Sequence, residues 1–134
     1  MLEFIKSVSS LLNRNQIEYL IVGSSAQLMY KEKVKPSDLD IWVRNNTYNA
    51  LKLKEIIRNN ELISEFQSGK IIRVIGKPYS IDFHPKLDGL KSNEIRSSRE
   101  VIELKDVKIK VIHKDDLKKN LETVNNMING AIAI

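Results

Sequence analysis

A short apolar run that stops at a glycine and two serines is the feature that most constrains the fold. Residues 17–22 read Ile-Glu-Tyr-Leu-Ile-Val, and Gly23-Ser24-Ser25 follows at once. An apolar run of this length with β-branched residues is typical of a buried strand. Ser24 or Ser25 is a suitable N-cap for a helix over the apolar residues 26–30. The pattern therefore predicts a strand, a turn and a helix in direct succession.

The remaining periodicity predicts a single α/β (α+β) domain over residues 1–134. Further helices are expected over 2–14, over about 48–58 behind a cap at 45–47, and from 114 to about 127 or 128, with Gly130 as a stop. Strands are expected over 38–43, 71–75 and 79–84, and a hairpin over 101–104 and 107–112. We expect a short mixed sheet with helices on one side and a core within about residues 15–120. The end, Ala131-Ile132-Ala133-Ile134, has no obvious place in this scheme.

The composition narrows the classes of protein that fit. A chain of 134 residues with 42% hydrophobic residues is long enough for one core. The absence of cysteine excludes disulfides, thiolate metal sites and a thiol nucleophile. The net charge of +5 tilts the expected partners towards nucleotides or nucleic acid. No apolar run approaches the roughly 18–20 residues of a membrane span, and the N-terminus lacks a signal-peptide core, so we expect no membrane and a cytoplasmic protein.

Three carboxylates are placed where they can meet. Asp38 and Asp40 are two apart in a predicted strand and so project from one face. Asp82 lies in a second predicted strand, and if the two strands are neighbours all three carboxylates converge. Their mutual repulsion needs a counter-charge. Carboxylates with open water positions suit Mg²⁺, so the metal candidates are Asp38, Asp40 and Asp82.

Gly23 and Ser24 are the second candidate feature. A glycine after a buried strand lets the backbone approach a ligand, and the N–H groups of a following helix suit phosphate. The alternatives are a plain turn with an N-cap at Gly23-Ser24, solvated strand-end acids at Asp38 and Asp40, and an ordinary strand acid at Asp82. His84, before Pro85, is interpreted as a surface or strand-end residue outside the site, and Lys118 as a surface lysine.

Taken together, these segments resemble the signature of the nucleotidyltransferase (polymerase-beta-like) superfamily. Gly23-Ser24, thirteen intervening residues, Asp38-Leu39-Asp40-Ile41 and then Asp82 follow the order of that signature. The chain is similar over about residues 15–120 to small stand-alone bacterial members, including those of abortive-infection and toxin–antitoxin systems. It departs from them in two places: Gln27-Leu28 stands where antitoxin-type enzymes tend to carry Arg-Gly, and the last helix lacks an expected arginine.

The resemblance implies a nucleotidyltransferase-like fold and a Mg²⁺-dependent transfer of a nucleoside monophosphate from an NTP to an acceptor hydroxyl. Asp38 and Asp40 would then ligate Mg²⁺, Asp82 would hold a second ion or take the acceptor proton, and Gly23 and Ser24 would bind the β- and γ-phosphates. The acceptor could be RNA, particularly a tRNA end, a protein or a small molecule. The short chain suggests a partner protein or a homodimer. The alternative is a non-catalytic, antitoxin-like regulator of the same fold that binds a nucleotide or a partner.

Overall fold

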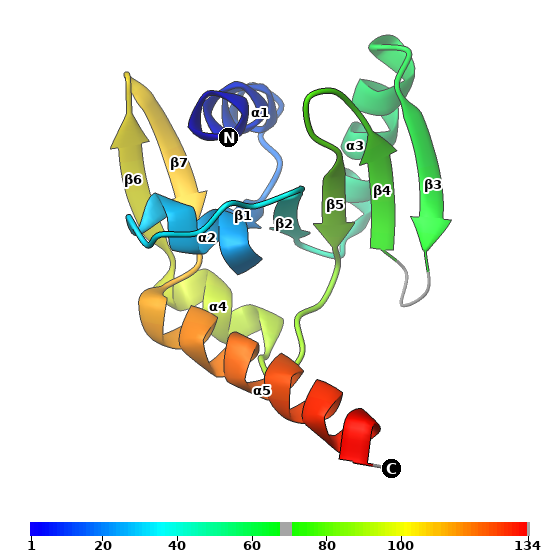
Figure 1. Ribbon diagram of the computed structural model, residues 1–134. Coiled ribbons are helices and arrows are strands. Elements are labelled where there is room, and N and C mark those ends of the chain that lie inside the picture. The colour runs from blue at the N-terminus through cyan, green and yellow to red at the C-terminus, as the bar shows by residue number, and fades with distance from the viewer. Residues whose placement is uncertain (68–70, 134) are drawn as a thin grey trace.

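The computed structural model describes residues 1–67 and 71–133 of the chain. Within them, helices and strands alternate as far as the third helix, after which the last two helices follow a run of three strands and a run of two strands (Figure 1). The helices are α1 (Leu2–Arg14), α2 (Gly23–Met29), α3 (Thr47–Asn59), α4 (Ser92–Ser98) and α5 (Lys114–Ala133). The strands are β1 (Tyr19–Ile21), β2 (Leu39–Val43), β3 (Ile63–Gln67), β4 (Ile71–Ile75), β5 (Ile81–His84), β6 (Glu100–Leu104) and β7 (Val107–Val111).

The strands of the described residues form one mixed sheet of seven strands, in the order β3-β4-β5-β2-β1-β7-β6. The pairs β2–β5 and β1–β7 are parallel, and the other neighbouring pairs are antiparallel. The sheet is therefore mixed, as expected, but larger than the short sheet predicted. Its central strand is β2, which carries Asp40.

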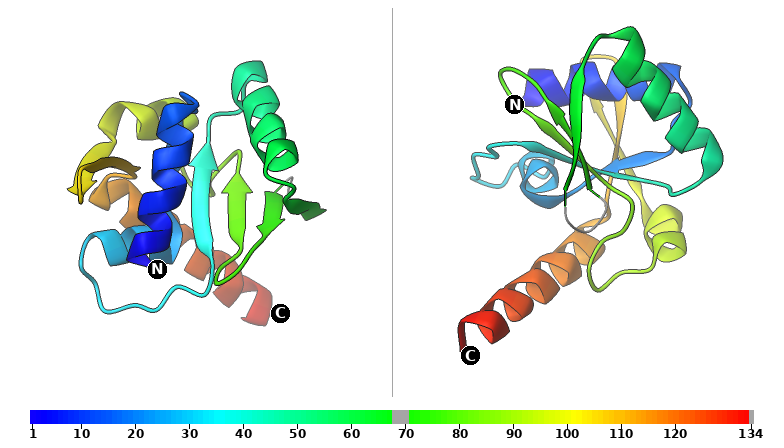
Figure 2. Two further views of the ribbon diagram at one scale, coloured as in Figure 1. Left: turned by 90° about the horizontal axis from the view of Figure 1, so that it is seen from above. Right: turned by 90° about the vertical axis from the view of Figure 1, so that its right-hand side faces the viewer.

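Helices cover both faces of the sheet, so the prediction of helices on one side is wrong. Successive side chains of a strand point to opposite faces, yet all three residues of β1 are buried, and so are Ile41 and Trp42 of β2. Figure 2 shows α1 and α3 on one side and α4 and α5 on the other. The fully buried large side chains come mainly from α1, from the centre of the sheet and from the β7–α5 junction: Ile5, Leu12, Ile17, Tyr19, Leu20, Ile21, Leu39, Ile41, Trp42, Ile95, Ile109 and Ile112.

The sequence located most elements but not their exact ends. Asn46 caps α3 as expected, because its side-chain oxygen accepts a hydrogen bond from the Asn49 backbone N–H at 2.8 Å. Neither Ser24 nor Ser25 is the N-cap of α2, since the helix begins at Gly23 with Val22 as an uncapped N-cap residue. Strand β2 begins at Leu39, so Asp38 lies just before it.

Two elements were not predicted, and one helix is longer than predicted. Strand β3 is an edge strand, held by pairing with β4, and α4 is a helix of seven residues that buries only Ile95. Helix α5 continues through Gly130 to Ala133, so Gly130 does not stop it. Residues 131–133 belong to this helix, and residue 134 of the predicted tail lies outside the described residues.

Helix α5 extends beyond the rest of the fold at its C-terminal end (Figures 1 and 2). Met127 and Ile128 on this part are exposed. A search of the described residues for membrane-spanning helices found none with the length and apolar character required.

Candidate active site

Four charged residues form one row across neighbouring strands, and Glu65 of β3, paired in register with Arg73, stands at its end. Asp40 of β2 is paired in register with Asp82 of the parallel strand β5. Asp82 is in turn paired with Arg73 of the antiparallel strand β4. Side chains at paired positions share one face of a sheet and lie within contact distance. The expectation that β2 and β5 are neighbours is therefore confirmed.

Arg73 joins two of the three predicted carboxylates. One terminal nitrogen of its guanidinium donates to Asp82 Oδ1 at 3.0 Å and Oδ2 at 2.9 Å. The other donates to Asp38 Oδ2 at 3.2 Å. Since the Arg73 side chain is only 23% exposed and that of Asp82 15%, these are half-buried charge-assisted hydrogen bonds.

The third carboxylate, Asp40, contacts a histidine. His84 Nε2 lies 2.9 Å from Asp40 Oδ1. His84 is two residues beyond Asp82 on β5, so both side chains emerge from the same face of the sheet. His84 is the last residue of β5, as the strand-end interpretation expected, but its side chain contacts one of the predicted site carboxylates.

The pKa values of Asp82 and Arg73 are shifted because several charged groups lie close together in a half-buried cluster. Burial raises the pKa of Asp82 above its ordinary value, and the charge of Arg73 opposes that shift, while Asp40 and Asp38 add to it by repulsion. The hydrogen bond to Asp38 and the charge of Asp82 raise the pKa of Arg73 further still. Arg73 is thus a permanent cation inside a group of carboxylates.

The start of α2 lies directly against the carboxylate strand. Gly23 has φ +60°, and a Cβ at this position would lie 3.2 Å from Asp40 Oδ2. The left-handed backbone favours glycine at this position, and a Cβ would also require the Asp40 carboxylate to shift by a few tenths of an ångström. Next to it, the buried Ser25 hydroxyl donates to the Asp38 carbonyl at 3.2 Å and accepts from the Asp40 N–H at 3.3 Å. Ser25 thereby fixes the position of Asp38 and Asp40 relative to α2.

The donor chemistry of this cluster suits a hard divalent cation, since it consists of three carboxylates and one imidazole. In the structure, however, oxygens of these carboxylates are already bound by Arg73 and His84. Within residues 1–67 and 71–133, no three or more His, Asp or Glu side chains are gathered in a form that could hold a metal ion. Asp38 and Asp82 face Arg73, and Asp40 faces His84. A metal ion would need these contacts to be rearranged.

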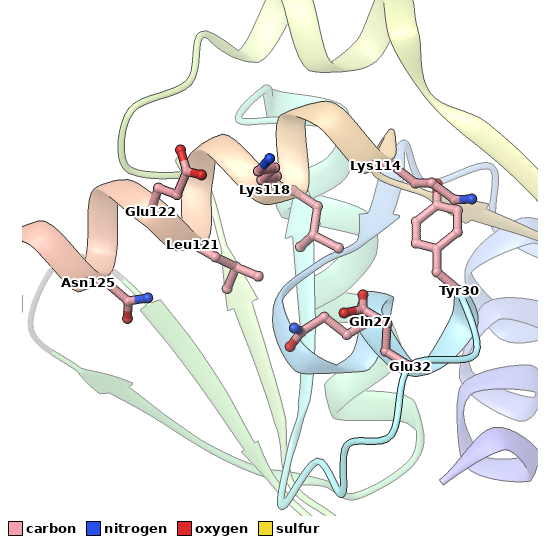
Figure 3. Close-up of a pocket in the computed structure, with 9 residues that line it drawn as sticks. Gln27, Tyr30, Glu32, Lys114, Lys118, Leu121, Glu122 and Asn125 are labelled. Atoms are coloured by element: carbon pink, nitrogen blue, oxygen red, sulfur yellow. The ribbon is translucent and has the colours of Figure 1, made fainter.

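A separate cavity lies between α2 and α5 (Figure 3). It has a volume of about 480 Å³, within the range of small-ligand sites. Tyr30, Leu117 and Leu121 supply apolar surface, and Lys114 and Lys118 supply positive charge. Its lining residues are Gln27, Tyr30, Glu32, Lys114, Leu117, Lys118, Leu121, Glu122 and Asn125. Gln27 belongs to the helix that Gly23 begins, about one turn or ~6 Å along the axis.

Known protein structures identify this architecture, although neither a protein-family model nor a curated sequence matches the chain. A protein of Thermotoga maritima, assigned provisionally as a nucleotidyltransferase, superposes with a TM-score of 0.79 over 98% of this chain and 89% of its own. An antigenic nucleotidyltransferase-like protein of Paracoccidioides brasiliensis superposes with a TM-score of 0.64, over 86% of this chain and 61% of its own. Each is 13% identical in sequence.

The chain has the nucleotidyltransferase fold. The predicted fold class is thereby confirmed, and at 13% identity the likeness concerns the fold. In this nucleotidyltransferase fold, the predicted residues Asp38, Asp40, Asp82 and Gly23 come together at the start of β2. Ser24 follows Gly23 in the first turn of α2 and is half-buried.

Sequence reasoning missed two residues of the cluster. His84 carried a usable signal, namely its two-residue spacing from Asp82 on a predicted strand. Arg73 carried a different one, as a single charge in the centre of the apolar run Ile71-Ile72-Arg73-Val74-Ile75. A charge inside such a run indicates a partner of opposite charge, but only the pairing of β4 with β5 identifies that partner as Asp82.

Proposed function

We propose that this chain is a Mg²⁺-dependent nucleotidyltransferase that moves a nucleoside monophosphate from an NTP to an acceptor hydroxyl. The observation that carries the proposal is the register of β2 with β5, which sets Asp40 beside Asp82, with Gly23 in close contact with Asp40. The nucleotidyltransferase fold of the chain supports it.

In the proposed reaction the acceptor oxygen attacks the α-phosphorus of the NTP. The bond from that phosphorus to the oxygen bridging to the β-phosphate breaks, and pyrophosphate leaves. Asp38 and Asp40 would hold Mg²⁺, and Asp82 would hold a second ion or accept the proton of the attacking hydroxyl. Bound Mg²⁺ would neutralise charge on the phosphates and orient them. Gly23 and Ser24 would contact the β- and γ-phosphates through the start of α2.

The cavity between α2 and α5 is our candidate for the rest of the nucleotide. It begins about one helical turn from Gly23, and its volume of about 480 Å³ suits a base and ribose. The apolar side chains of Leu117 and Leu121 would contact the base, and Lys118 would reach towards the phosphates. For the acceptor we propose an anionic molecule such as RNA. The exposed Lys31, Lys33 and Lys35 precede Asp38 along the chain and support this choice.

Label transfer tests the proposal. The full chain is incubated with Mg²⁺ and each α-labelled NTP, with total RNA, cell lysate or a set of aminoglycosides as acceptor. The Asp38→Asn/Asp40→Asn double variant removes the two proposed ligands. A Glu61→Gln/Glu94→Gln double variant is the matched control, since it removes two exposed acids on other segments. We expect label on one acceptor class with the wild type and the control, and none with the aspartate variant.

Two other outcomes separate the alternatives. If no acceptor is labelled but the wild type binds Mg-NTP and the aspartate variant does not, the chain is a nucleotide-binding regulator of the same fold. If the wild type neither transfers label nor binds any Mg-NTP, both nucleotide functions are refuted. A partner-binding role, with a second protein or a second copy of the chain, then remains.

A further inference from the structure

Arg73 is the residue of the carboxylate cluster that the proposed function leaves without a role. It lies opposite Asp82 in the sheet and binds both oxygens of that carboxylate through one nitrogen, while its other nitrogen binds Asp38. A metal ion held by Asp38 and Asp82 would need oxygens that the guanidinium now occupies. Arg73 and the ion therefore compete for the same carboxylates.

The net charge of the cluster also indicates that Arg73 and a metal ion compete. Without a metal, Asp38, Asp40 and Asp82 contribute three negative charges and Arg73 one positive charge, which leaves a net charge of minus two on these four residues. Removal of Arg73 would leave three carboxylates with no permanent cation among their contacts in the described residues. Such a group attracts a divalent ion more strongly.

A purely structural role explains Arg73 less well. A half-buried ion pair contributes little net stability, because the desolvation of its charges offsets their attraction. The neighbours of Arg73 on β4, Ile72 and Val74, pack on the core, so the strand is anchored without it. What the guanidinium does hold in place is the pair of Asp38 and Asp82, which come from segments 44 residues apart in sequence.

We propose that Arg73 is a positioning residue that acts as an internal counter-cation, holding Asp38 and Asp82 in the metal-free protein and competing with the divalent ion for them. This inference rests on the proposed function, because it assumes that the carboxylates bind metal. It makes metal occupancy dependent on the displacement of a side chain of the protein itself. The wild-type site would then bind a divalent ion more weakly than its carboxylates alone allow.

Binding of Mn²⁺, followed by the electron paramagnetic resonance signal of the free ion, tests this proposal without any reaction. Arg73→Met removes the charge and keeps most of the stem, and Arg73→Gln is a second neutral variant in case the first does not fold. Arg58→Met is the matched control, since it removes an exposed arginine on α3. We expect both neutral Arg73 variants to bind Mn²⁺ about tenfold more tightly than the wild type, and the control to bind as the wild type does. Arg73→Lys keeps the charge, and its affinity for Mn²⁺ is expected to lie between that of the wild type and that of the neutral variants.

Each outcome has one meaning. A loss of the tighter binding when Asp38→Asn or Asp82→Asn is added to Arg73→Met places the ion at the carboxylates that Arg73 holds and supports the proposal, whereas tighter binding that survives both additions overturns it. Equal or weaker Mn²⁺ binding by the folded neutral variants overturns it, while carboxylate-dependent binding by the wild type leaves the proposed function intact. No Mn²⁺ binding by the wild type or by any Arg73 variant overturns both. Circular dichroism of every variant establishes that the protein tested is folded.

Discussion

At the scale of single residues, Tyr30 shows how one side chain ties distant segments together. Its hydroxyl donates to the Ile112 carbonyl at 2.7 Å, and the Lys114 ammonium lies 5.1 Å from the centre of its ring. Burial, with a smaller contribution from the charge of Glu100, raises the pKa of Tyr30 to about 12. The residue therefore joins the end of α2 to the start of α5 at the cavity.

Replacement of Tyr30 by phenylalanine removes this hydrogen bond. We expect the Tyr30→Phe variant to lose about 1 kcal/mol of unfolding free energy at neutral pH. Because the pKa of the folded state is raised, the stabilisation by the hydroxyl is complete below the unfolded pKa of about 10 and is lost as the pH rises through about 12. Denaturant unfolding at pH 7 and at increasing alkaline pH measures the difference between the two proteins.

A spectroscopic measurement provides the control for this prediction. Ultraviolet absorbance after rapid alkaline jumps should show a tyrosine that ionises near pH 12 in the wild type and a smaller change there in Tyr30→Phe. An unchanged titration would contradict the assignment of this late ionisation to Tyr30.

At the scale of elements, α5 shows how a helix continues past a glycine. Glycine ends helices when its backbone turns to the left-handed conformation. Gly130 lies within the helix instead, and a Cβ at this position would meet nothing within 4 Å. Its only effect is then the loss of backbone entropy that a glycine suffers in a helix.

Gly130→Ala should therefore stabilise α5. We expect more helical signal at 222 nm and an unfolding free energy higher by up to about 0.5–1 kcal/mol, with the lower end favoured because the site is close to the helix end. Thermal and chemical unfolding followed by circular dichroism measure both quantities. A loss of stability would indicate a left-handed cap at Gly130 and a helix that ends before it.

One edge strand, β3, and one short helix, α4, are the elements that sequence reasoning missed. Strand β3 forms one edge of the sheet and is held by pairing with β4, and α4 is anchored by the single buried side chain of Ile95. Neither segment has a long periodic pattern of apolar residues that sequence analysis could detect. Each is held in place by its neighbours in the fold instead. Helix α1 and strand β7, whose apolar faces are buried in the core, were predicted within a residue or two of their observed ends.

At the scale of the whole molecule, the fold has one continuous core. Trp42 is the only tryptophan, lies in the central strand and is fully buried, so its fluorescence reports on the middle of the sheet. The far-ultraviolet circular dichroism is dominated by the helices. Among the helices that the structure describes, α5 is the longest, with 20 residues. Two optical signals thus report on different parts of the same structure.

The prediction of a single domain implies that both parts unfold together. We expect the fluorescence of Trp42 and the helical dichroism to give the same denaturant midpoint and slope. A helical transition that precedes the tryptophan transition would instead show that α5 unfolds on its own. A chain truncated after residue 124, which lacks the projecting end of α5, would then give coincident signals.

The sequence alone determined those features that depend on local spacing. The alternation of side chains along a strand predicted that Asp40 points to one face of the sheet, although Asp38, expected in the same strand, lies just before it. The glycine after the buried strand β1 indicated either a plain turn or a close approach of the backbone, and Gly23 does lie against Asp40. The resemblance of these residues to the nucleotidyltransferase signature predicted the fold, and the superpositions confirm that prediction.

Only the tertiary structure decided which charges meet. Arg73 and Asp40 are 33 residues apart, and they join one row because β5 pairs with β4 on one side and β2 on the other. A shift of one residue in either register would turn Asp82 away from its partners, and no local period in the sequence specifies that register. The contacts of Arg73 and His84 with the carboxylates are therefore a property of strand pairing, set by the burial of the whole sheet.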